Sequence, residues 1–94
     1  MIQKVFAVRD GKAEAFLQPF YSVNAGSATR AFDDTINASD GNQLAKHPAD
    51  YVLYELASFD DNSGKFINCE PAKLLGSGVD FVRKEVVNVK EKKV

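Results

Sequence analysis

The sequence predicts an α+β fold in which a small antiparallel sheet carries one helix packed on one face. Short runs rich in β-branched and aromatic residues are bounded by turn signals, and one segment of helical periodicity lies between them. A length of 94 residues leaves room for a single core. We expect the order strand, strand, helix, strand, strand in one domain over residues 1–82, followed by a basic C-terminal extension over residues 83–94.

The first two predicted strands form a hairpin. Residues 1–10 are typical of a strand and end at Asp10-Gly11, a strong hairpin signal. Residues 13–23 form the second strand. Pro19 lies inside it and cannot donate a backbone hydrogen bond, so we expect this strand at an edge of the sheet, or bent at the proline.

Residues 25–38 form the predicted helix. Apolar and small side chains recur there at helical spacing and would make one narrow stripe toward the sheet, namely Ala28, Ala31, Phe32, Thr35 and Ile36. Asn24 is the candidate N-cap, with Ser27 as the alternative. We expect the helix to end in the Asn- and Gly-containing cluster that follows.

Residues 51–59 carry the clearest strand pattern. Strict alternation places Val52, Tyr54 and Leu56 on one face and the remaining side chains on the other, namely Tyr51, Leu53, Glu55, Ala57 and Phe59. Residues 65–70 form the partner strand, and the intervening "DDNSG" is typical of a hairpin loop. A calcium loop of the EF-hand type is excluded because Lys65 or Phe66 would stand where such a loop needs glycine.

The last part of the domain has weaker signals. Pro71 ends the preceding strand, and we expect a helical turn over residues 72–75 and a short extended piece over residues 79–82. The longest apolar runs are far below the roughly 20 residues that a membrane helix needs. The N-terminus lacks the pattern of a signal peptide. Cys69 is the single cysteine, so no internal disulfide framework is expected and a reducing cytoplasm is the default compartment.

The net charge of −1 conceals an asymmetry along the chain. Residues 1–82 contain seven Lys and Arg against eleven Asp and Glu, a net charge of −4, whereas residues 83–94 contain five against two, a net charge of +3. Phosphate binding depends on clustered Lys and Arg. The body of the domain therefore opposes nucleic-acid binding, and the tail favours it.

We expect no catalytic centre, metal site or cofactor. His47 is the single histidine, which excludes a His-rich metal site. A nucleophilic pair of Cys69 and His47 is conceivable, but a cysteine within a strand is usually a small buried apolar residue. The adjacent pairs Asp33-Asp34 and Asp60-Asp61 are better explained as solvated surface, because acid–base catalysis usually needs carboxylates from separate elements.

The ten aromatic residues suggest a binding face. One helix can cover only one face of the sheet, and we expect Phe6, Phe32 and Tyr54 to fill the core beneath it. Tyr51 and Phe59 would then lie on the open face. Exposed aromatic side chains on a sheet can stack single-stranded bases, at roughly 1–3 kcal/mol per base. They can equally form a dimer or partner interface.

Several motifs resemble the small nonstructural protein of gokushoviruses, the microvirus subfamily that includes the Chlamydia phages. The resemblance covers residues 3–82 and excludes the basic tail. It rests on Asp10, Lys12 and Ala13 before an aromatic run with Phe16, Pro19 and Phe20, on Gly26, Ala28, Arg30 and Phe32 in the helix, and on His47, Pro48, Asp50 and Tyr51 before the third strand. The "FDDNSGK" turn completes the set.

The resemblance implies a protein of a small circular single-stranded DNA phage that acts in the host bacterial cytoplasm. It implies DNA binding, or a part in the switch from duplex replication to single-strand genome synthesis. It supplies no catalytic residues and implies no enzyme activity.

Two readings from different classes follow. In the preferred one the protein binds single-stranded DNA, with Tyr51 and Phe59 stacking on bases and basic side chains contacting phosphates, namely Lys4, Arg9, Lys12, Arg30, Arg83, Lys84, Lys90, Lys92 and Lys93. In the alternative it is a protein–protein adaptor, itself a homodimer, that binds the phage initiator, the procapsid or a host replication protein through the same face. Neither reading involves a membrane.

Overall fold

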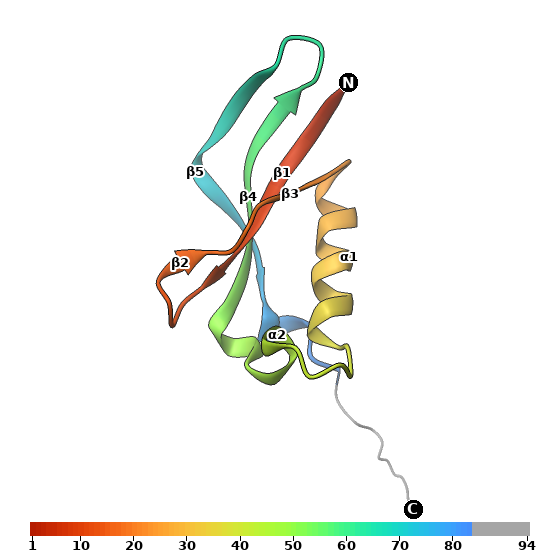
Figure 1. Ribbon diagram of the computed structural model, residues 1–94, viewed down its shortest axis with the longest axis vertical. Helices are drawn as coiled ribbons and strands as arrows, with labels where there is room; N and C mark the ends of the chain where they lie inside the picture. The colour runs from red at the N-terminus through yellow and green to blue at the C-terminus, as the bar shows by residue number, and fades with distance from the viewer. Residues whose placement is uncertain (84–94) are drawn as a thin grey trace, which may run out of the picture.

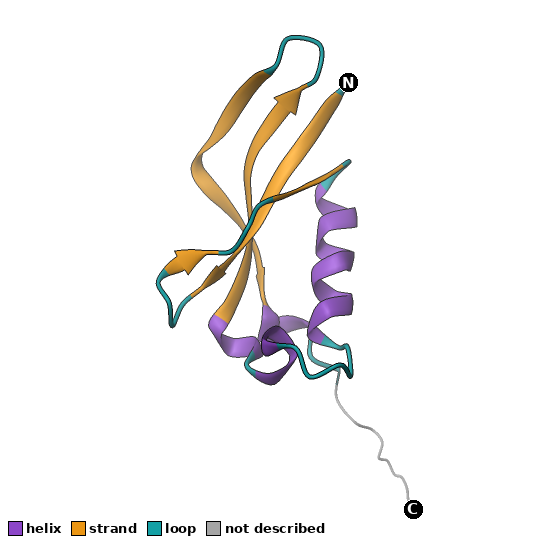
Figure 2. Cartoon of the chain, in the orientation of Figure 1, coloured by secondary structure: helices purple, strands orange, loops and turns teal. Residues whose placement is uncertain are grey.

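The fold is a twisted antiparallel sheet with one long helix beside it. The structure is a computed structural model that describes residues 1–83 (Figure 1, Figure 2). The elements in chain order are β1 (Ile2–Asp10), β2 (Ala15–Phe16), β3 (Phe20–Ser22), α1 (Ala25–Ile36), α2 (Gln43–Lys46), the 3-10 helix η1 (Pro48–Asp50), β4 (Tyr51–Asp60), β5 (Lys65–Ser77) and the 3-10 helix η2 (Gly78–Phe81). The predicted α+β class is confirmed.

The five strands form one sheet. Its order is β2-β1-β4-β5, and β3 also pairs with β1, on the same side of β1 as β2. The predicted second strand is thus split in two, with Pro19 in the gap between β2 and β3. Proline offers no backbone N–H, which limits it to an edge or an interruption. The prediction that Pro19 places this segment at an edge of the sheet is confirmed.

Helix α1 packs against one face of β1 and β4. Asn24 is its N-cap, as predicted, and its side-chain oxygen accepts a hydrogen bond of 2.8 Å from the backbone N–H of Ser27. The buried helix residues are Ala28, Phe32 and Ile36. They join a core whose strand residues are Phe6, Val8, Tyr51 and Leu53. Figure 1 shows α1 standing to one side of the sheet, with α2 at its C-terminal end.

A β-bulge divides strand β4 into two halves. Val5 pairs with Ala57, but its neighbour Phe6 pairs with Glu55, so Leu56 is an extra residue in β4. Because side chains alternate along a strand, one extra residue reverses the alternation beyond it. Before the bulge, the odd-numbered residues Tyr51, Leu53 and Glu55 face α1. After the bulge, the odd-numbered residues Ala57 and Phe59 face away from α1.

The face prediction for the first half of β4 is wrong, and the bulge separates Tyr51 from Phe59. Tyr51 and Leu53 were expected on the open face, but they lie in the core at 7% and 0% exposure. Glu55 also faces α1, because it pairs with Phe6. Tyr54 was expected in the core and points away from α1. The placements of Phe6 and Phe32 in the core are confirmed, and Phe59 lies on the open face because it follows the bulge.

The β4–β5 hairpin contains the predicted "DDNSG" turn. The Asp60 side chain accepts a hydrogen bond of 2.9 Å from the backbone N–H of Asn62, and the Asp60 carbonyl accepts one of 2.7 Å from Gly64. Gly64 has φ 75°, a left-handed conformation that glycine adopts without strain. The turn prediction is confirmed.

The end of the domain differs from the prediction. Residues 72–75 belong to β5 rather than to a helical turn, since Leu74 pairs with Tyr54 of β4. The pairing between β4 and β5 is irregular from Asn68 to Lys73, around the cis peptide bond before Pro71. Residues 78–81 form η2 instead of a strand, because the Asp80 carboxylate accepts a hydrogen bond from Ser77 at its start.

Candidate functional site

The sheet face opposite α1 is the candidate site, here called the open face. Directly paired residues of antiparallel strands point to the same side, so the register defines its members. Helices α1, α2, η1 and η2 do not take part in it. The side chains of the open face are Gln3, Val5, Ala7, Arg9, Phe16, Tyr21, Val52, Tyr54, Ala57, Phe59, Phe66, Asn68, Leu74 and Ser77.

Three aromatic rings gather near the β4–β5 turn and form what we call the arm cluster. The ring of Phe59 lies 4.8 Å from that of Phe66 and 5.9 Å from that of Tyr21, measured between centroids. Tyr21 and Phe66 remain 51% and 56% exposed. The arm cluster therefore offers two accessible rings supported by a third.

Two further rings form the edge cluster at the other end of the open face. Phe16 of β2 and Tyr54 of β4 meet edge to face, with centroids 5.5 Å apart. Phe16 is 45% exposed. Leu74, exposed on β5, lies opposite Tyr54 in the register. The edge cluster thus adds a third accessible ring to those of Tyr21 and Phe66.

Small residues form the floor between and beneath these rings. Val5, Ala7 and Ala57 are buried although α1 lies on the other side of the sheet. Their paired neighbours include Tyr21 and Tyr54, whose large side chains shield them from water. The aromatic rings therefore stand on a packed layer of small side chains.

The open face is free of acidic side chains at its regularly paired positions. Arg9 is the single formally charged residue among them. The strand carboxylates of Asp10, Glu55 and Asp60 point to the α1 side, because each is paired with a residue of that side. At the regularly paired positions, therefore, no carboxylate opposes an anionic ligand; Glu70 of β5 lies in the irregularly paired stretch and is not placed by the register.

The predicted phosphate contacts are scattered. Lys4 and Arg83 are engaged in ion pairs, with Glu55 at 3.3 Å and with Asp33 at 3.4 Å. Lys12 lies in the β1–β2 turn and Arg30 on the exposed side of α1. Of the predicted basic residues that the structure describes, Arg9 alone is on the open face. The remaining ones lie outside the described residues, namely Lys84, Lys90, Lys92 and Lys93.

The predicted stacking pair is divided. Tyr51 is a core residue, and its assignment to base stacking is wrong. Phe59 lies on the open face but is half-buried beneath its neighbours. The exposed rings are those of Phe16, Tyr21 and Phe66, which the sequence did not single out. Their position follows from the strand pairing, which places each opposite a residue of the open face and which the sequence does not specify.

A polar hollow of about 400 Å³ lies at the far end of β1. Tyr51 contributes to it, and burial raises the pKa of the Tyr51 phenol above its ordinary value, assisted by the carboxylates of Asp10 and Asp50. These two carboxylates make the hollow unsuited to phosphate. It is lined by Asp10, Lys12, Gln43, His47, Asp50 and Tyr51.

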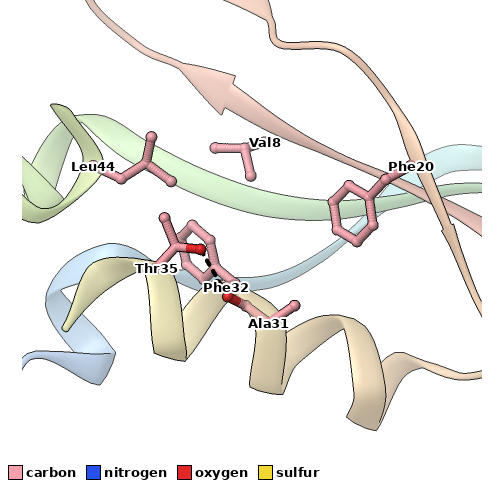
Figure 3. A pocket seen from close by; sticks show the side chains of 6 residues that line it. All are labelled: Val8, Phe20, Ala31, Phe32, Thr35 and Leu44. Carbon is pink, nitrogen blue, oxygen red and sulfur yellow. Dashed lines mark hydrogen bonds between the residues drawn. The ribbon is translucent and has the colours of Figure 1, made fainter. Parts of the chain in front are cut away.

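An apolar pocket of about 210 Å³ separates α1 from β3 and α2 (Figure 3). The Thr35 hydroxyl donates to the Ala31 carbonyl at 2.9 Å, so its proton is not available to a ligand. The pocket lacks other polar groups and borders the core residues Val8 and Phe32. We interpret it as incomplete core packing. It is lined by Val8, Phe20, Ala31, Phe32, Thr35 and Leu44.

The conceivable catalytic pair is not assembled. His47 lines the polar hollow, whereas the Cys69 thiol lies 3.9 Å from the Glu55 carboxylate. Within residues 1–83, no group of three His, Cys, Asp or Glu side chains is placed to hold a metal ion. The expectation of a nonenzymatic protein stays a prediction.

Among residues 1–83, Glu55 is the buried charged side chain, and its pairing with Lys4 gives a testable prediction. Its Oε2 accepts from Lys4, while Oε1 has no partner among the described residues. Lys4→Met should lower the free energy of unfolding by about 1–3 kcal/mol, because it leaves a buried carboxylate without its cation. Lys4→Met combined with Glu55→Met should recover most of that loss. Urea unfolding at neutral pH measures the stability of both variants. If Lys4→Met were as stable as the natural chain, the ion pair would not stabilise the fold.

Comparison with known proteins gives a family. A family model described as "Phage ORF5 protein" matches residues 3–81, from β1 to the end of η2. Searches of curated proteins and of solved structures returned no match. In the part of the chain that the structure describes, no helix is long and apolar enough to cross a membrane. The resemblance to a phage protein is confirmed, while the narrower assignment to gokushoviruses stays a prediction. The chain belongs to the phage ORF5 protein family.

Proposed function

We propose that this phage protein binds single-stranded DNA through the open face, without enzymatic activity. In the host bacterial cytoplasm it would coat or mark the displaced strand during the switch from duplex replication to single-strand genome synthesis. The observation that carries the proposal is the set of three exposed rings, Phe16, Tyr21 and Phe66, on a face whose regularly paired positions hold no carboxylate.

In this proposal the aromatic rings stack on bases, and separate basic side chains contact the phosphates. Each exposed ring offers an apolar surface to a base, and such stacking is sequence-tolerant because every base has a π-face. Arg9, on the same face, would contact a phosphate. Further phosphate contacts would come from Lys84, Lys90, Lys92 and Lys93 of the basic tail, which supplies most of the positive charge that the body lacks.

Salt dependence tests the proposal. For the full chain and a fluorescent oligonucleotide, five phosphate contacts at a slope of about 0.7 each predict a loss of affinity on the order of 100-fold between about 50 and 200 mM salt. A full-length variant with the four tail lysines changed to glutamine should keep weak binding with a much shallower slope. Absence of binding by the natural chain at low salt would overturn the function.

A second candidate is the protein–protein adaptor. Ile2 and Ile67 are 54% and 68% exposed, and they point to the other side of the sheet near the β4–β5 turn. Exposed aliphatic side chains of this kind suit a protein partner or a second copy of the chain. Light scattering as a function of concentration tests self-association. A dimer that is lost in Ile67→Asp would favour this candidate.

A further inference from the structure

We propose that one extended strand of about four nucleotides occupies both aromatic clusters at once, along a track parallel to β1. This inference rests on the proposed function and specifies its ligand. The arm cluster and the edge cluster would be two parts of a single site. A ligand too short to reach from one to the other would lose half of the available stacking.

The track follows from the register of β1. Its side chains on the open face are Gln3, Val5, Ala7 and Arg9, which define four levels. Each level has one aromatic residue directly opposite on a neighbouring strand. In order from Gln3 to Arg9, these residues are Phe59, Tyr21, Tyr54 and Phe16.

The rings alternate between the two sides of β1. Phe59 and Tyr54 come from β4, whereas Tyr21 and Phe16 come from β3 and β2 on the opposite edge. At the level of Gln3, Phe66 of β5 lies beside Phe59, on the side away from β1. The two rows touch across β1, since Tyr21 contacts Phe59 and Phe16 contacts Tyr54, so the rings cover the small buried residues Val5 and Ala7. A strand would therefore lie on the exposed surfaces of the rings, above β1.

The spacing of the levels suits an unstacked strand. Residues two apart in a β-strand advance by roughly 6.8 Å. This is about twice the 3.4 Å between stacked bases in a duplex, so a strand that follows the levels must be extended and unstacked. Four levels therefore accommodate about four nucleotides, one for each pair of β1 residues.

The two clusters are distinct groups of rings on the same face. Ring contacts join Tyr21 to Phe59 and Phe16 to Tyr54, but among the described residues no ring contact joins Tyr21 to Tyr54. Arg9 stands at the edge-cluster end of the track, opposite Phe16. Its guanidinium can contact the phosphate of a nucleotide that stacks on that ring.

A length series tests the two-cluster site. Binding of dT2, dT4 and dT8 is measured for the full chain, for Phe16→Ala and for Phe66→Ala. Affinity should rise steeply from dT2 to dT4. The further rise to dT8 should be smaller and sensitive to salt, because the added phosphates reach the tail lysines rather than another ring. Each substitution should weaken dT8 binding about 5-fold to 150-fold, the range for loss of one stacked base. For dT2 each should cost at most about twofold, since the other cluster remains available.

Ile67→Ala is the matched control, because Ile67 neighbours Phe66, is comparably exposed and points to the other side of the sheet. It should leave dT8 affinity unchanged. Circular dichroism should show all variants folded, since every substituted side chain is substantially exposed. If dT2 binds as tightly as dT8, or if either Phe substitution behaves like Ile67→Ala, the two-cluster site is overturned while DNA binding stands. If the natural chain binds none of the oligonucleotides, the proposed function fails with it.

Discussion

Phe6→Ala should destabilise the domain by about 3–5 kcal/mol, the usual cost of truncating a buried phenylalanine. Phe6 is fully buried in the central strand β1 and stacks on Phe20 at a centroid distance of 5.8 Å. It also belongs to the cluster through which α1 packs on the sheet. Its loss therefore removes apolar burial and leaves a cavity between the two layers, because the neighbouring strands fix the backbone on both sides.

Thermal and urea unfolding measure this effect. In a domain of this size the melting temperature should fall by about 15 °C or more. Ile67→Ala, at a position that is 68% exposed, should stay within about 0.5 kcal/mol of the natural chain. A loss below about 1 kcal/mol for Phe6→Ala would mean that α1 and the sheet do not share the core described above.

Gly78→Ala should destabilise the domain by about 3 kcal/mol, at the upper end of overpacking effects. A Cβ atom at this position would overlap the Pro48 carbonyl oxygen and would lie 2.8 Å from Cδ1 of Ile36. The first of these neighbours is backbone and cannot rotate away. Relief would require η2 to separate from η1 and from the C-terminal end of α1, which would open the base of the core.

Gly11→Ala is the control for this substitution. Its Cβ would meet the Asp50 carbonyl oxygen at 3.4 Å, which is ordinary contact. We expect its unfolding midpoint in urea to lie close to that of the natural chain, whereas the midpoint of Gly78→Ala should fall clearly. Equal midpoints for the two variants would show that η1 and η2 are not packed as closely as described.

Local signals predicted most of the secondary structure. Asn24 caps α1 because its short side chain reaches the N–H of Ser27, and Pro19 divides an edge strand because it lacks a donor. Both effects act within a few residues. The course of β5 beyond Pro71 was not predictable in this way, because its extended conformation depends on pairing with Tyr54 and its neighbours in β4.

The candidate site was predicted in kind but not in its residues. The expectation of an aromatic face opposite a single helix agrees with the structure, yet Tyr51 is inside and Tyr54 outside. Alternation within β4 holds on each side of Leu56, but the extra residue is visible only once β1 is paired with it. Phe16, Tyr21 and Phe66 come from three other strands, so their convergence also depends on strand order, which sequence patterns do not specify.

The extra residue at Leu56 has a consequence for how related chains are compared. Counting every second position from Tyr51 assigns Phe59 and Leu53 to the same face of the sheet. In the structure, Phe59 contacts the exposed ring of Phe66, whereas Leu53 is buried in the core beneath α1. In a relative that lacked one residue between Glu55 and Ala57, interior and exterior would be exchanged for the whole outer half of the hairpin. A single-residue gap at this point of an alignment would therefore mark a different molecular surface, even where the surrounding letters agree.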